Sequence, residues 1–369
     1  MNKKFLSALI ATSVFAVGCA NNEGDSSASE NTNDDTEITT NLEGVPESLN
    51  DDIKVAVIRN LPSDDHTTQF LDGARSEGES FGFEVDTYIS DGDDARFQDL
   101  VSQAINSDYD GMIISHGKES YSYNMLEPAR DRDIEVVTFD TVAERDGETL
   151  EGVTSTAQND ALLAEYSLEE AIHFSENDVP NIIKITVGGI VPLDNRDVVY
   201  KQYEEEGKIN TLQEIGPQNM QSVISDITSA TNSILSTYGE GEIDIIWAAW
   251  DELAKGAYNA IKENGRHDVD LVSIDVSNQD INFMTEENST WLSTAAVDPH
   301  LIGVMNMRLL AMKLAGEETP DTYELEPHII RQEDLDSDTV MNSLNEVIDG
   351  WGESEDFNQD WMNILRENN

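Results

Sequence analysis

The chain has 369 residues, which is enough for two or three domains with extensive hydrophobic cores. It carries 75 Asp and Glu residues against 21 Lys and Arg, a formal net charge of −54. This charge excludes nucleic acid as a partner, because a phosphate backbone would be repelled. The single cysteine excludes an intramolecular disulfide, so packing must supply the stability.

The acidic excess is spread over the whole chain, and regular apolar segments follow residue 53. We therefore interpret it as a property of a folded surface rather than of a disordered chain. Such a surface stays hydrated in concentrated salt, which shortens the Debye length to about 3 Å at 1 M and screens the repulsion between carboxylates. The composition predicts a halophilic bacterium or archaeon as the source, with an alkaliphile as the alternative.

The first 19 residues have the pattern of a lipoprotein signal peptide. Two lysines and an uncharged apolar run over residues 5–17 precede Gly18 and Cys19, the only cysteine. The run is shorter than the ~20 residues that cross a bilayer. Two acyl chains on Cys19 would attach the protein stably to the outer face of the cell membrane. An ordinary secretory signal with a chance cysteine is the alternative.

Residues 20–52 are rich in acids, Ser, Thr and Asn and contain no Lys or Arg. This composition predicts an acidic, disordered tether that holds the folded part away from the bilayer.

Strand and helix patterns then alternate, with strands at intervals of roughly 25 to 30 residues, as in a parallel sheet covered by helices on both faces. In the first half, the expected strands are Ile53–Ile58, Phe83–Ile89, Gly111–Ser115 and Glu135–Phe139, and the expected helices are Thr67–Phe81 and Ala95–Ile105. In the second half, the expected strands are Ile182–Val187, Asn210–Ile215, Asp244–Ala248, Asp270–Ile274 and Trp291–Ala296. The helices there are Asp160–His173, Arg196–Tyr203, Met220–Ser236, Asp251–Asn264 and Leu301–Leu314. The repeated pattern therefore predicts two similar α/β lobes.

Ligands of open parallel sheets bind beyond the carboxyl ends of the strands. The polar residues that follow the expected strands are Asn60, Asp64, Asp65, His66, His116, Lys118, Asp140, Asp194, Asn195, Arg196, Trp250, Asp251, Asp275, Asn278 and Asp298. Asp65 and Asp251 could instead be helix N-caps. A cation near a helix start is unfavourable for the helix dipole, which favours a ligand or interlobe role for Arg196.

The sequence holds no motif of a catalytic or metal site. It lacks a GxSxG elbow, a phosphate-binding loop, an HExxH pair and a Cys–His pair, and its six histidines have no metal-ligand spacing. Asp91–Asp94 is interpreted as a turn, because the downstream ligands of a calcium loop are absent. We therefore expect no enzymatic activity, no cofactor and no metal.

Six segments, in order over about residues 53 to 330, resemble the type I periplasmic sugar-binding proteins, the ribose-binding-protein-like receptors of ABC importers. They are the first strand with LDGA from Leu71, DGMIIS from Asp110, IEVVTFD from Ile134, WAAWDELAKGAYNAI from Trp247, LVSIDVSNQD from Leu271 and VDPHLIG from Val297.

The resemblance implies a fold of two doubly wound parallel-sheet lobes joined by a three-strand hinge. The expected crossings lie near Ser155–Ala157, Val297–Asp298 and Glu326–Pro327. The first lobe then comprises residues 53–157 with 298–326, and the second 158–297 with 327–350, before a polar tail over 351–369.

By the same resemblance, Asp140, Arg196, Trp250, Asp251 and Asp275 would contact a ligand between the lobes. Where ribose-type receptors have two adjacent aromatic residues, this chain has Asp65 and His66, so Trp250 would provide the stacking face. His116 completes the expected ligand-binding set.

The implied function is that of a monomeric lipoprotein that captures a monosaccharide or polyol and delivers it to an ABC permease. A receptor that presents a sugar or furanosyl autoinducer to a membrane sensor is the alternative. A glycan hydrolase is disfavoured because no nucleophile motif is present, and a sugar-responsive transcription factor would need a basic DNA-binding segment in place of the signal peptide.

Overall fold

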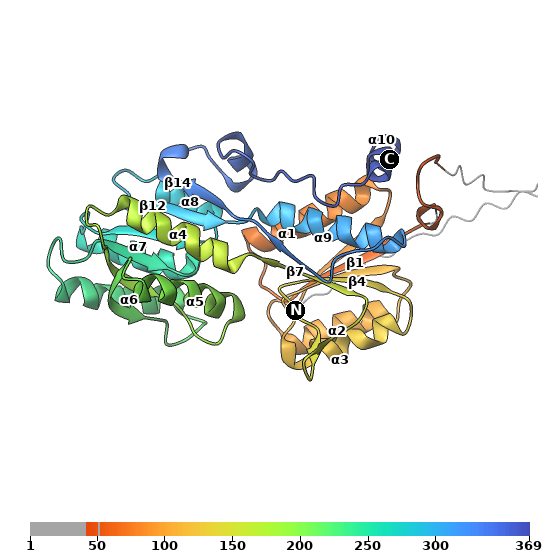
Figure 1. Ribbon diagram of the computed structural model, residues 1–369, viewed down its shortest axis with the longest axis horizontal. Helices are drawn as coiled ribbons and strands as arrows, with labels where there is room; N and C mark the ends of the chain where they lie inside the picture. Colours follow the sequence, from red (N-terminus) through yellow and green to blue (C-terminus); the bar gives the residue numbers. More distant parts are fainter. Residues whose placement is uncertain (1–41, 51) are drawn as a thin grey trace, which may run out of the picture. The chain divides into compact units, whose positions relative to one another are not determined.

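The computed structural model describes residues 42–50 and 52–369, and these form two lobes, each built on a six-stranded sheet (Figure 1). Cys19, the signal peptide and the start of the expected tether lie outside the described residues. The fold class predicted from the sequence is confirmed.

The sheet of the first lobe is parallel throughout, in the order β13-β7-β4-β3-β1-β2. Its strands are β1 (Lys54–Arg59), β2 (Glu84–Ile89), β3 (Gly111–Ser115), β4 (Glu135–Phe139), β7 (Val153–Gln158) and β13 (Thr322–Leu325). Its helices are α1 (Asp65–Ser80), α2 (Asp94–Ile105), α3 (Glu119–Arg130) and α9 (Pro299–Leu314), and a small hairpin pairs β5 (Glu144–Arg145) with β6 (Glu148–Thr149).

Both faces of this sheet are buried, which explains why its central strands read as continuous apolar runs. In β1, Val55 and Val57 pack with α1 and α9, whereas Ala56 and Ile58 pack with α2 and α3. Figure 1 shows these two helix pairs on opposite sides of the sheet.

The sheet of the second lobe has the order β14-β12-β11-β10-β8-β9. Its strands are β8 (Asn181–Ile185), β9 (Asn210–Ile215), β10 (Ile245–Ala248), β11 (Asp270–Ile274), β12 (Trp291–Ala296) and β14 (His328–Arg331). Its helices are α4 (Asp160–Phe174), α5 (Val191–Glu205), α6 (Val223–Thr237), α7 (Asp251–Asn264) and α8 (Asn278–Met284).

One strand departs from the expected parallel arrangement: β14 is antiparallel to β12. The connections between the lobes explain this direction. The chain leaves the second lobe after β12, adds α9 and β13 to the first lobe, and re-enters at residues 326–327. Because β14 starts near the lobe boundary, where β12 ends, it has to run in the opposite direction.

Three connections join the lobes, after β7, after β12 and after β13. The first lies at Asn159, slightly later than expected, and the others lie at residues 297–298 and 326–327. The backbone N–H of Asn159 donates to the carbonyl of Leu325 at 3.0 Å, so two of the connections are hydrogen-bonded to each other.

The two ends of the described chain pack more closely than the sequence suggests. Residues 42–50 were expected to belong to the tether, but Leu49, in the 3₁₀ turn η1 (Glu47–Leu49), is buried in the first lobe's core. The expected polar tail contributes Trp351 to the core of the second lobe. The tail then forms α10 (Asp360–Asn368), and Trp361 of this helix packs into the core of the first lobe.

Short 3₁₀ turns precede this tail at η2 (Gln332–Asp334) and η3 (Met341–Glu346). None of the helices in the described part of the chain is long and apolar enough to span a membrane.

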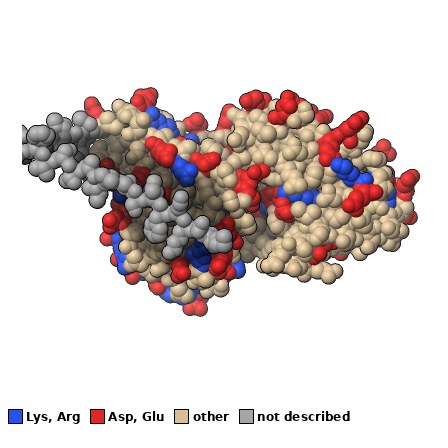
Figure 2. All heavy atoms as spheres, turned by 180° about the vertical axis from the view of Figure 1, so that it is seen from behind, with Lys and Arg blue, Asp and Glu red and all other residues tan. Residues whose placement is uncertain are grey.

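Acidic side chains are scattered over the face of the molecule in Figure 2 rather than gathered in one patch. We therefore expect the melting temperature to rise as NaCl increases from low to molar concentration, because salt screens repulsion among exposed carboxylates. Circular dichroism during heating measures this. The matched control replaces, by Gln, five exposed glutamates that form no ion pair within residues 42–50 and 52–369: Glu204, Glu205, Glu240, Glu318 and Glu346.

The control variant should gain less from salt than the wild type. A flat or falling melting temperature in the wild type would contradict the interpretation of the charge as a salt adaptation.

Candidate functional site

Three of the predicted site residues share an unusual backbone conformation at the carboxyl ends of strands. His116 follows β3, Asp140 follows β4 and Asp275 follows β11, with φ angles of 64°, 44° and 72°. The left-handed region costs a non-glycine residue about 1 to 2 kcal/mol. Strain of this kind persists where the surrounding structure holds it, and it is concentrated at binding and catalytic sites.

The neighbouring strands hold these residues in place. The backbone N–H of Asp140 donates to the backbone carbonyl of Thr156 at 2.9 Å, and the backbone N–H of Asp275 donates to the backbone carbonyl of Ala295 at 2.8 Å. The backbone N–H of His116 donates to the backbone carbonyl of Phe139 at 3.1 Å. Each residue therefore adds one more rung to its parallel ladder before the left-handed turn directs its side chain away from the sheet.

A buried arginine organises the first lobe's part of the site. Arg59, the last residue of β1, is fully buried, and its guanidinium lies 4.6 Å from the centre of the Phe70 ring. It donates to Thr67 at 3.1 Å, to Ser115 at 3.1 Å and to Nδ1 of His66 at 2.8 Å. Burial lowers the pKa of Arg59 to about 10, so the guanidinium is still charged at neutral pH.

The contacts of Arg59 determine the tautomers of both histidines. Nδ1 of His66 accepts from Arg59, and Nδ1 of His116 accepts at 2.7 Å from Ser115, whose oxygen already accepts from Arg59. Burial and the charge of Arg59 lower the pKa of His66 to about 3, and that of His116 also falls well below its usual range. Both rings are thus neutral and carry their proton on Nε2.

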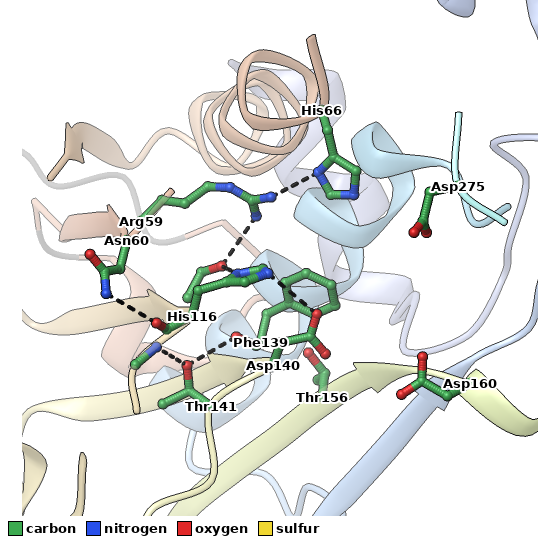
Figure 3. Close-up of polar contacts among 12 residues, drawn as sticks. Arg59, Asn60, His66, His116, Phe139, Asp140, Thr141, Thr156, Asp160 and Asp275 are labelled. Carbon is green, nitrogen blue, oxygen red and sulfur yellow. Dashed lines mark hydrogen bonds and ion pairs between the residues drawn. The ribbon is translucent and has the colours of Figure 1, made fainter. Parts of the chain in front are cut away.

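Asp140 lies beside one of these N–H groups, with its Oδ2 3.6 Å from Nε2 of His116 (Figure 3). Burial, assisted by the charge of Asp160, raises the pKa of Asp140 to about 7, although Arg59 and Arg196 oppose this shift. The carboxyl group therefore changes its charge near neutral pH.

The second lobe is organised by Arg196, which is 1% exposed on α5. Its Nε donates to Asp160 at 3.0 Å, and one terminal nitrogen donates to Asp275 at 2.9 Å and to the carbonyl of Ala249 at 2.7 Å. The other terminal nitrogen reaches Asp275 at 3.4 Å. Arg196 thus joins the start of α4 to the ends of β10 and β11 and compensates two carboxylates.

Trp250 and Asp251 stand at the start of α7. Trp250 occupies the N-cap position, and no side chain caps the helix there, so the N-cap interpretation of Asp251 is wrong. The Asp251 carboxylate instead accepts at 2.9 Å from Lys255, one turn along the helix. Trp250 is half-buried against the core of the second lobe.

Asp65 lies apart from the other site residues. The cap of α1 is its neighbour Asp64, which accepts from Thr67, so Asp65 is not the cap. Asp65 is exposed, and its carboxylate accepts from the backbone N–H and the side-chain amide of Asn278 at 3.2 and 3.0 Å. This contact joins α1 of the first lobe to α8 of the second.

The remaining groups from the two lobes lie close enough for their charges to interact. Asp275 and Arg196 of the second lobe both act on His66, and Asp160 and Asp275 act on Asp140. Figure 3 shows His66, His116 and Asp140 directed toward the same region as Asp160 and Asp275. Arg59 and Asp160 were not among the predicted ligand-binding residues.

Within the described residues, no group of three or more His, Cys, Asp and Glu could hold a metal ion. A cavity of about 580 Å³ lies outside the site. It is lined by α1, by the start of α9, by η3 and by the segment around Trp351, and contains none of the predicted ligand-binding residues.

The family described as periplasmic binding protein domain matches residues 55–318. The chain therefore belongs to the periplasmic binding protein family, and the predicted resemblance to its ribose-binding type is confirmed. No curated protein sequence matches the chain.

Among solved structures, the chain is similar to a sugar ABC transporter protein from Yersinia enterocolitica subsp. enterocolitica 8081. The identity is 42% and the TM-score 0.76, over 88% of this chain and 98% of that one. A 5-methylthioribose transporter solute binding protein from Thermotoga lettingae, in complex with 5-methylthioribose, is 28% identical, with a TM-score of 0.74 over 86% and 99% of the two chains. A glucose-galactose binding protein from Geobacillus stearothermophilus, 17% identical with a TM-score of 0.64 over 77% and 99%, shares the fold.

The raised pKa of Asp140 predicts a pH-dependent stability. Between the unfolded value near 4 and the folded value of about 7, the folded state binds the extra proton, so stability falls as pH rises through this window. Asp140→Asn should therefore stabilise the protein without ligand by about 1 to 3 kcal/mol at pH 8 and much less at pH 4. Chemical unfolding at both pH values measures this.

Asp99→Asn, at an exposed position of α2, is the control and should give no comparable gain in stability at pH 8. A gain from Asp140→Asn that does not depend on pH would show that Asp140 is ionised throughout.

Proposed function

We propose that this protein captures a small neutral polyhydroxylated solute, a monosaccharide or polyol, between its lobes and delivers it to an ABC importer. Membership of the periplasmic binding protein family supports this. So do the two most informative relatives, one a sugar ABC transporter protein and the other bound to 5-methylthioribose. Both relatives are components of solute transport rather than enzymes.

The observation that carries the proposal is the compensation of charge within the site. Arg196 is paired with Asp160 and Asp275, and both histidines are neutral. Arg59 has no carboxylate partner, but it is fully buried and its three nitrogens bond to Thr67, Ser115 and His66. The carboxylates of the site would repel a phosphate or carboxylate. A neutral solute with many hydroxyl groups meets these conditions.

In this proposal, the two lobes provide different hydrogen-bonding groups to the solute. The Nε2–H groups of His66 and His116 are donors from the first lobe, and the Asp275 carboxylate is an acceptor from the second. A hydroxyl group both donates and accepts, so adjacent hydroxyls of one sugar can satisfy both sides. Hydrogen bonds to charged groups are worth about 1.5 to 3 kcal/mol each.

The other predicted residues have supporting parts in this proposal. Asp140 accepts from a hydroxyl, and Trp250 stacks on the apolar face of the ring. Arg196 acts mainly by holding Asp160 and Asp275, because most of its donors are already used. Asp65 holds the lobes together through Asn278, and the three connections between the lobes allow them to close on the solute.

Calorimetry and thermal shifts with pentoses, hexoses, polyols and 5-methylthioribose at high salt test the proposal. A true solute at 100 times its dissociation constant should add about 2.7 kcal/mol of stability. Asp140→Ala and Arg196→Ala should each weaken its binding by roughly ten- to a thousandfold.

The matched control is Asp93→Ala, which removes the exposed N-cap of α2 and should cost about 1 kcal/mol of stability without changing affinity. If no member of the panel binds, or if both site variants keep the wild-type affinity, the proposed function or the proposed site is wrong.

The proposal includes attachment to the outer face of the cell membrane through Cys19, which rests on the signal-peptide pattern of the sequence. Cys19→Ser should abolish lipid modification and processing after Gly18 and release the protein from the membrane fraction, while sugar binding is unchanged. Mass spectrometry and fractionation of cells measure this. A soluble, unmodified wild-type protein in its native host would contradict the anchor.

A further inference from the structure

A lysine lies inside the second lobe directly behind the site. Lys255 on α7 is 3% exposed, and its ammonium group is 2.9 Å from Asp251 and 3.5 Å from Asp280. It also contacts Glu252 at 2.5 Å. Burying a lysine is costly unless it is paired with acidic groups. The three acidic partners around the Lys255 ammonium group indicate that it remains charged and compensates carboxylates inside the lobe.

Asp280 is the most deeply buried of these acids, with no exposed surface. Its Oδ2 accepts from the backbone N–H and the hydroxyl of Ser277 at 2.6 and 2.7 Å, in the capping box of α8. Its Oδ1 has no hydrogen-bond partner among the described residues and faces Lys255. The start of α8 therefore holds one oxygen of Asp280, and the other oxygen is directed at the ammonium group.

We propose that Lys255 is a positioning residue whose contact with Asp251 fixes the orientation and the charge of that carboxylate, which in turn accepts a hydrogen bond from the bound solute. Neither Lys255 nor Asp280 touches the solute. This inference rests on the proposed function, because it assigns Asp251 to the ligand-binding surface.

The charges around Asp251 explain why it needs this support. Asp280 on α8 and Asp275 at the end of β11 both act on Asp251, and Glu252 is its neighbour on α7. The charge of Arg196 is already shared between Asp160 and Asp275. Burial, assisted by the charge of Asp275, raises the pKa of Asp251, and the Lys255 ammonium opposes this rise.

Replacing Lys255 should therefore have two effects with opposite pH dependence. Without the ammonium group, the buried carboxylates lose stability as they ionise, so Lys255→Met should be closest to the wild type in stability near pH 5 and furthest from it near pH 8. For binding, loss of the ammonium group raises the pKa of Asp251 further, so that at lower pH more of its carboxyl group is protonated and loses its value as an acceptor. Affinity relative to the wild type should thus fall about tenfold at pH 6 and much less at pH 8.5.

Thermal unfolding between pH 5 and 9 and calorimetry with D-ribose and 5-methylthioribose as probes measure these effects. Lys255→Arg keeps the charge and should restore both pH profiles. In an Asp251→Asn background, Lys255→Met should cost little further affinity, because the group that it positions is gone. Asp280→Asn keeps the Lys255–Asp251 pair and should leave the pH profile of relative affinity flat.

Equal loss of stability by Lys255→Met at every pH, or equal loss of affinity with and without Asp251, would overturn the inference and leave Lys255 with a packing role. If Lys255→Met does not fold, a fall in relative affinity toward low pH in Asp280→Asn would overturn it instead. The measurement of stability needs no solute. It can therefore overturn the inference even if the wild type binds neither probe, a result that would itself count against the proposed function.

Discussion

The second lobe's part of the site depends on one buried guanidinium. Arg196 bonds the first turn of α4, the end of β10 and the end of β11 at once, through Asp160, Ala249 and Asp275. Removing it would leave two largely buried carboxylates without a cationic partner, which is far more costly than the net value of the ion pairs themselves. The same contacts orient Asp275, so the stability of this lobe and the geometry of its binding surface have a common source.

The two lobes present complementary groups because each buries a cation in a different way. In the first lobe, Arg59 points its donors at uncharged acceptors, two side-chain hydroxyls and Nδ1 of His66, and keeps both histidines neutral. In the second, Arg196 is saturated by carboxylates. The first lobe therefore offers N–H donors and the second offers acceptors. A ligand rich in hydroxyl groups can bond to both lobes, whereas an anion would be repelled by the carboxylates of the second lobe.

Much of the fold could be predicted because strands buried on both faces leave a clear apolar signal, and β3, β4, β11 and β12 have the expected bounds. The edge strand β9 also has the expected bounds, although none of its residues is buried. The elements that were missed have weaker signals. Pro128 interrupts the pattern of α3, and β7 reads VTSTAQ, with few apolar residues. For the site, the ends of the predicted strands indicate where the site residues lie, but they do not show which side chains these residues contact. In the sequence, Asp251 has the position of a possible helix cap, and only the structure shows its contact with Lys255. In the same way, the sequence shows Arg59 only as the polar last residue of an apolar strand.

The distribution of cations connects the site to the charge of the whole chain. With only 21 Lys and Arg residues available, five in the described residues are buried: Arg59, Lys184, Arg196, Lys255 and Arg266. Each of these lies against acceptors that would be costly to bury alone, and three of them support the interlobe site. Five acids of the described residues are buried as well: Asp160, Glu170, Asp251, Asp280 and Asp298. The buried charges therefore balance in number, and the acidic excess of the chain lies outside this buried set. Screening by salt acts on the exposed carboxylates and hardly at all on the buried pairs, since these are shielded from the solvent. The protein can therefore adapt its exterior to the solvent while the electrostatics of the binding surface stay the same.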